Sequence, residues 1–199
     1  MAADWEKTRK TFRHGSLATA LVDAALVRLE ETGVDALSLR DLARDVGVNH
    51  RAVYRHFPDK LSLLARVAEE GWRQLQRRVK KKLAGKPKGQ RALVGAGVGF
   101  FLFARDHPNL FAMMAGPRIN MNRAFPGLEA AMAETMEMFR RPFIDSGVEA
   151  EQARVRAALL VSALQGVTAQ ILYRRLRVSR AKANDFVKQT CRMLFKGLS

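Results

Sequence analysis

The chain has 199 residues, of which 48% are hydrophobic, and its 35 Lys and Arg outnumber its 19 Asp and Glu for a net charge of +16. This length allows one or two domains with a buried core, and the charge favours a polyanionic partner. There is no apolar run of membrane-spanning length and no apolar leader, so we expect a cytoplasmic protein without a membrane span. The single cysteine, Cys191, excludes an internal disulfide.

Helical periodicity without strand-like alternation predicts an all-α fold. The first fifteen residues form a polar arm whose basic side chains, Arg13 among them, can lie along phosphates; a frayed, solvated terminus is the alternative. Ser16 is a suitable N-cap for a first helix that runs to Thr32, and Gly33 is a suitable stop.

The stretch from Leu37 to Lys60 predicts two short helices joined by a tight turn. Ser38 is the expected N-cap of the first, with Asp41 completing a capping box. Gly47 can adopt the left-handed or similarly unusual backbone conformation that ends a helix abruptly. Asn49 is the expected N-cap of the second helix. This pattern is typical of a helix-turn-helix.

The second of these helices is expected to have two different faces. Val53 and Phe57 should pack inward, whereas Arg51 and Tyr54 should point outward to a partner. A helix of this width fits the major groove of DNA, where Arg51 can donate two hydrogen bonds to guanine. The predicted DNA-binding residues are Arg13, Ser38, Arg40, Asn49, His50, Arg51, Tyr54, Arg55, His56 and Lys60.

The positive charge is unevenly distributed along the chain. Residues 1–60 hold 10 Lys and Arg and 9 Asp and Glu, whereas residues 61–91 hold 10 and 2. The prediction of DNA binding therefore depends on where the few N-terminal charges sit. The basic cluster from Arg77 to Arg91 is interpreted as a solvated linker, with a patch for flanking DNA or another anionic partner as the alternative.

A long helix is predicted from Lys60 to Lys82, with an inner face formed by Leu61, Leu64, Ala68, Trp72 and Leu75. In the following apolar segment, three glycines (Gly95, Gly97 and Gly99) predict either close backbone contact or a cavity. Met and Phe side chains suit an adaptable apolar pocket, although ordinary core packing is the alternative. The predicted ligand-binding residues are Phe100, Phe103, Phe111, Met114, Met136 and Phe139.

The C-terminal part is expected to contain a helix that Pro142 ends or kinks, followed by two long helices, about 149–175 and 179–196. The first of this pair is apolar over much of its circumference, so it must be covered on more than one side. We therefore expect these two helices to form a homodimer interface.

The helix-turn-helix stretch resembles the DNA-binding domain of the TetR family of transcriptional regulators between His14 and Leu64. The resemblance depends on Gly33, Leu37-Ser38-Leu39, Leu42-Ala43, Gly47-Val48 and above all Tyr54-Arg55-His56-Phe57-Pro58-Asp59-Lys60 with Leu63-Leu64. A second, shorter segment, FARDHPNLFAMM, resembles the effector domain of some members. The sequence departs from many relatives at Asn49 to Ala52, where these have small residues.

The resemblance implies a DNA-binding domain at 1–60 and a ligand-binding and dimerisation domain at 61–199. We expect a sequence-specific homodimeric repressor that a small apolar effector releases from a double-stranded DNA operator. No two of His14, His50, His56 and His107 are four residues apart, so the sequence lacks a pair of histidine metal ligands on one helical face. No other catalytic, cofactor-binding or metal-binding motif occurs in the sequence. The alternatives are a sequence-independent architectural DNA-binding protein and a helical ligand-binding module without DNA specificity.

Overall fold

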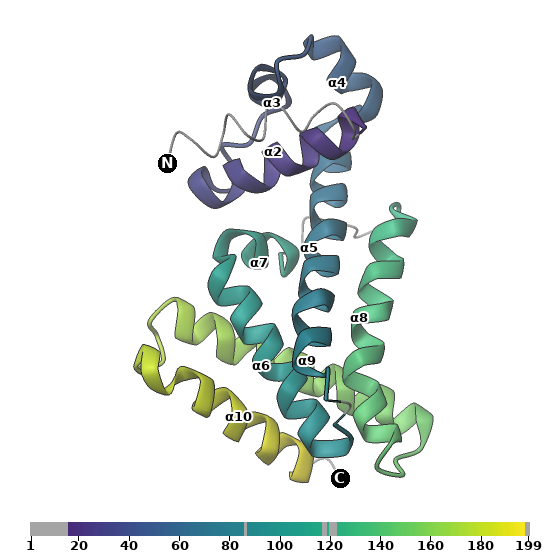
Figure 1. Cartoon of the computed structure of the whole chain (residues 1–199), viewed down its shortest axis with the longest axis vertical. Coiled ribbons are helices and arrows are strands. Elements are labelled where there is room, and N and C mark those ends of the chain that lie inside the picture. Colours follow the sequence, from purple (N-terminus) through teal and green to yellow (C-terminus); the bar gives the residue numbers. More distant parts are fainter. Residues whose placement is uncertain (1–15, 86, 117–118, 120–122, 198–199) are drawn as a thin grey trace.

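The computed structural model describes residues 16–85, 87–116, 119 and 123–197, and every regular element in these ranges is an α-helix, which confirms the all-α prediction. A head of three helices lies at one end, and α5 runs from it along the length of the body (Figure 1). The helices are α2 Leu17–Thr32, α3 Leu39–Val46, α4 His50–His56, α5 Lys60–Lys82, α6 Gly89–Asp106, α7 Pro108–Met114, α8 Pro126–Ile144, α9 Ala150–Leu172 and α10 Arg180–Gly197.

The head folds around a small apolar core that its three helices share. Leu21, Ala25 and Leu29 of α2, Leu42 of α3 and Val53 of α4 are completely buried. Outside this core, the guanidinium of Arg28 on α2 donates to the carboxylate of Asp45 on α3, with Nη2 2.9 Å from Oδ1. This hydrogen bond raises the pKa of Arg28 and fixes α3 against α2.

Side-chain caps set the ends of the two helix-turn-helix elements. Ser38 Oγ accepts a hydrogen bond from the Asp41 amide at 3.3 Å, and Asn49 Oδ1 accepts from the Arg51 amide at 2.9 Å. Gly47 is left-handed, with φ of 74°. The reciprocal half of the predicted capping box is absent, because the Asp41 carboxylate pairs with Arg44 on the exposed side of α3.

The connecting helix α5 has the predicted bounds, but its cap was not foreseen. Asp59 and Ser62 form a capping box at its start, with Asp59 Oδ1 2.7 Å from the Ser62 amide nitrogen. Its inner face contains Leu64, Ala68, Trp72 and Leu75 as expected. The inclusion of Leu61 was wrong: Leu61 is 43% exposed, and Leu63 takes the buried position instead.

Close helix packing explains the glycines of α6. A Cβ added at Gly99 would lie 3.0 Å from Cα of Val79, so α5 and α6 touch through their backbones here. A Cβ added at Gly97 would overlap Sγ of the buried Cys191 on α10. Of the two predicted explanations, close backbone contact is therefore the correct one at these positions.

The last helices differ from the prediction at two points. α8 continues past Pro142 to Ile144, so Pro142 does not end it, although proline cannot donate a hydrogen bond to the carbonyl four residues back. The last turn still closes, because Asp145 donates to the Arg141 carbonyl at 2.9 Å. α9 ends at Leu172 rather than Arg175, where Arg174 takes a positive φ of 57°. α9 is long and apolar enough to cross a membrane by length and composition alone. Core helices of soluble proteins meet the same two criteria, so this is weak evidence for a membrane span.

Candidate nucleic-acid interface and effector cavity

The helix α4 lies at the tip of the head with one face turned outward (Figure 1). Val53 and Phe57 are 0% and 5% exposed, and they hold α4 against α2 and α3. The other face carries His50, Arg51, Tyr54 and Arg55, and all four are exposed. The two-faced helix predicted from the sequence is therefore present, and its polar side is available to a partner.

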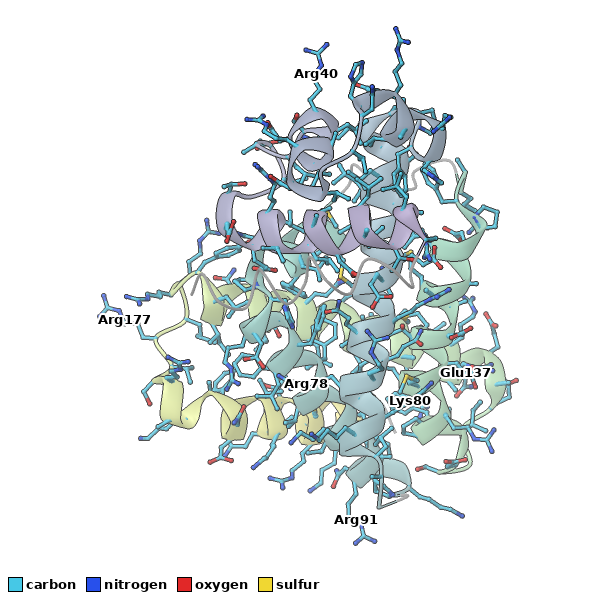
Figure 2. All side chains as sticks on the ribbon, turned by 45° about the horizontal axis from the view of Figure 1, so that its top comes forward. Arg40, Arg78, Lys80, Arg91, Glu137 and Arg177 are labelled. Carbon is cyan, nitrogen blue, oxygen red and sulfur yellow. The ribbon has the colours of Figure 1, made fainter. Side chains whose placement is uncertain are left out.

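A shallow groove between α3 and α4 gathers further polar groups at the same tip. It is lined by Arg40, Ala43, Arg44, Val48, Asn49 and His50. Arg40 points away from the body (Figure 2). Because Asn49 uses its side-chain oxygen in the cap of α4, its amide nitrogen remains to donate outward. The tip thus presents mainly donors, which suit phosphate oxygens and the acceptors of base edges.

The remaining predicted DNA contacts lie around this tip. His56 is exposed at the end of α4, and Ser38 is half-buried at the start of α3. Lys60 Nζ donates to the carbonyl of Asp35 at 3.1 Å, so it braces the loop before α3 while two of its donors remain for an anion. Arg13 lies outside the described residues.

The basic cluster at the end of α5 lies far from this tip. Lys80 and Arg91 lie towards the end of the molecule opposite Arg40 (Figure 2). The rise of an α-helix places Lys80 about 30 Å along α5 from Lys60. Arg77 pairs with Glu70 at 2.6 Å, and Arg78 pairs with Asp106. The cluster is therefore separate from the recognition surface, and part of its charge is neutralised internally.

An apolar cavity of about 380 Å³ lies in the body and is open to solvent on one side, where Ala158 and Ser162 of its wall are exposed. Its walls come from α5, the end of α7, α8 and α9. They consist of Ala68, Trp72, Met114, Ala115, Gly116, Ile119, Leu128, Met132, Met136, Ala158, Val161, Ser162 and Gln165. Of the predicted ligand-binding residues, Met114 and Met136 are in this wall.

The four predicted phenylalanines do not line this cavity. Phe100 packs edge-on against Phe111 and Phe139, with ring centroids 5.6 and 6.2 Å away, and Phe103 contacts His107. All four phenylalanines are buried, at 6% exposure or less. They form the core between α6, α7 and α8, which was the alternative interpretation from the sequence.

Sequence reasoning missed most of the actual cavity wall. Trp72 was assigned only to the inner face of α5, and Met132 was not among the predicted ligand-binding residues. Ser162 and Gln165 interrupt the otherwise apolar middle of α9 on one side of the helix. Two polar residues on one side of an apolar helix are the signal that could have marked this wall.

A helix-turn-helix tip on a separate helical body is the arrangement of a DNA-binding transcription regulator with a C-terminal ligand-binding domain. Residues 21–67 match the family described as "Bacterial regulatory proteins, tetR family", and residues 93–194 match "Tetracyclin repressor-like, C-terminal domain". The chain belongs to the TetR family of transcriptional regulators. Members of this family are regulators and not enzymes, in agreement with the sequence-based prediction.

Solved structures share this fold along nearly the whole chain. A protein of unknown function from Rhodococcus sp. RHA1 has 25% identity and a TM-score of 0.79, over 94% of this chain and 97% of its own. A TetR variant from Acinetobacter baumannii AYE, in complex with minocycline, has 21% identity and a TM-score of 0.65, over 92% and 96%. A TetR transcriptional regulator from Rhodococcus sp. RHA1 has 20% identity and a TM-score of 0.64, over 98% and 99%.

Proposed function

We propose that the protein is a cytoplasmic homodimeric repressor that binds a partly palindromic operator and leaves it when a small apolar effector occupies the body. The observation that carries this proposal is the exposed polar face of α4, held outward by the buried Val53 and Phe57. Family membership supports DNA binding and a ligand-binding C-terminal domain.

Within this proposal, α4 enters the major groove with its N-terminal end leading. Arg51 donates two hydrogen bonds to a guanine, and Tyr54 packs against a thymine methyl or donates to a phosphate. His50 and Asn49 reach base edges or backbone at the same end. Phosphate contacts by Arg13, Ser38, Arg40, Arg55, His56 and Lys60 would fix the register of the head on the duplex.

The last two long helices support the proposed dimer. Val155 and Leu159 lie one turn apart on α9 and are 48% and 52% exposed, and Met193 on α10 is 73% exposed. Only 28% of the most apolar window of α9 is buried within one chain. A second copy packed on α9 and α10 would cover this apolar surface and place two heads on one duplex.

The short helix α7 supports a connection between the cavity and the head. Its last turn ends at the cavity, where Met114 is part of the wall. Its first turn is capped by Glu30 of α2: Glu30 Oε1 accepts from the Leu110 amide at 2.9 Å, and Oε2 accepts from the Asn109 amide at 3.2 Å. Asn109 Nδ2 in turn donates to the Glu30 carbonyl at 3.0 Å.

An effector can release the operator only if it binds one arrangement of the heads better than the other. A ligand that pushes on Met114 would act on a helix whose opposite end is bonded to the head. We therefore propose that α7 transmits cavity occupancy to α2, in addition to the continuous helix α5.

Selection of bound fragments from a pool of random duplex DNA, at fixed salt, tests the proposal. We expect enrichment of two inverted half-sites about 10 base pairs apart, because paired recognition helices enter successive major grooves. Enrichment of a single half-site would contradict the dimer. Binding without any enriched sequence, with a steep salt dependence, would instead indicate a sequence-independent architectural DNA-binding protein.

A further inference from the structure

We propose that the cavity between α5, α8 and α9 binds an uncharged aromatic compound that carries one hydrogen-bonding group. Its rings would lie against Trp72 and the methionines of the wall, and its polar group would bond to Gln165 and Ser162. The inference that this ligand is also the effector rests on the proposed function. The inference that it binds to the DNA-free protein does not.

The described part of the cavity wall carries no charged side chain, which favours a neutral ligand. None of the described residues that line the cavity is Asp, Glu, Lys, Arg or His. The nearby buried carboxylate of Glu69 is already held by Arg66 at 2.8 Å and by Arg73 at 2.5 Å. A charged ligand would therefore lose part of its hydration without gaining an opposite charge from the described wall, which costs more than burial of a neutral group.

The apolar side chains of the wall favour an aromatic ligand. Trp72 is 8% exposed and presents a large flat ring, and three methionines (Met114, Met132 and Met136) surround the same space. Sulfur–aromatic contacts are favourable, so an aromatic ligand gains more here than an aliphatic one. A volume of about 380 Å³ is near the lower limit for small-molecule sites, which suits one or two rings.

A pair of polar side chains on α9 would orient the ligand. Ser162 and Gln165 are three residues apart on the same face and both reach the cavity. Neither side chain hydrogen-bonds to another residue in the described part of the chain, and together they offer donors and acceptors. A primary amide or a similar neutral group on the ligand can use both.

Equilibrium dialysis of the full-length, DNA-free protein against three probes tests the proposal. The probes are para-phenylbenzamide, the equally shaped but anionic para-phenylbenzoate, and decanamide, which keeps the amide on a flexible aliphatic chain. We expect para-phenylbenzamide to bind at least about tenfold more tightly than either of the others. No binding of para-phenylbenzamide, or equal affinity for the benzoate or for decanamide, would overturn the proposal.

Variants locate the site. Gln165→Leu should weaken para-phenylbenzamide about fivefold, the loss of one hydrogen bond, whereas Gln74→Leu on the cavity-free side of α5 should change nothing. In a Trp5→Phe variant Trp72 is the one remaining tryptophan, and its fluorescence should change on binding. If Gln165→Leu does not weaken the binding of para-phenylbenzamide, or if Trp72 fluorescence does not change on binding, the ligand lies elsewhere and the proposal is overturned.

These outcomes are distinct from those that test the repressor. A ligand that binds as described but leaves the operator complex intact would count against effector-driven release alone. An operator selected with two half-sites but no binding of para-phenylbenzamide would count against the cavity chemistry alone.

Discussion

At Gly97 the main chain of α6 lies directly against the sulfur of Cys191 on α10. Gly97→Ala should lower the free energy of unfolding by about 1–3 kcal/mol, since the added methyl group overlaps a buried atom. Urea unfolding would measure this loss. Gly197→Ala, at the open end of α10, should stay within about 0.5 kcal/mol, and adding Cys191→Ala to Gly97→Ala should restore part of the loss. Unchanged stability of Gly97→Ala would contradict this packing.

The thiol of Cys191 should make stability depend on alkaline pH. Burial raises its pKa from 9.0 to about 12. Between these values the unfolded chain loses a proton that the folded protein keeps, so the free energy of unfolding falls as pH rises, while below pH 9.0 there is no such effect. Relative to Cys191→Ala, the wild type should lose more stability across this window. Parallel curves for the two proteins would show that the thiol is not buried.

At the scale of single elements, α7 is bonded to the head at one end and faces the cavity at the other. Glu30→Gln removes the charge that caps α7, and Glu31→Gln, on an exposed neighbour, is the matched control. We expect Glu30→Gln to reduce the difference in ligand affinity between free and operator-bound protein, because that difference is the coupling between the sites. Calorimetric titration of both forms would measure it. An undiminished difference would show that α7 does not transmit the signal.

The sequence was most informative where structure is decided by residues close in the chain. The ends of α3 and α4 depend on Ser38, Gly47 and Asn49, and each acts within a few residues of itself. The outward face of α4 follows from the spacing of Val53 and Phe57 in the same way. These local features are sufficient to predict the candidate DNA-binding surface from the sequence.

The sequence was least informative where several helices meet. α6 is apolar on almost every side, so periodicity could not show whether Phe100 faces the cavity or the core. Leu61 and Leu63 are equivalent by composition, and only the packing of the head against α5 decides that Leu63 is buried. The cavity wall depends on contacts between helices distant in sequence, which is why Trp72 and Gln165 were not assigned to it.

For the whole molecule, the exposed apolar face of α9 predicts a dimer, because a single chain leaves this face uncovered. Leu159→Lys should abolish the dimer, because a lysine on a buried interface loses its hydration without a partner, while the fold of each chain is unaffected at this exposed position. Ala133→Lys on the exposed side of α8 is the matched control. Sedimentation should show monomers for the first variant and dimers for the second. Dimers of Leu159→Lys would place the interface elsewhere.

The central claim is that the exposed face of α4 reads base edges in the major groove, and guanine N7 methylation interference on the selected operator tests it most directly. We predict two groups of guanines, one helical turn apart, whose methylation blocks binding. Arg51→Ala should lose about 1–3 kcal/mol of binding free energy together with the interference at one guanine in each half-site, whereas Arg141→Ala on α8 should change neither. Operator binding that tolerates methylation at every guanine N7, or that is unaffected by Arg51→Ala, would contradict the account.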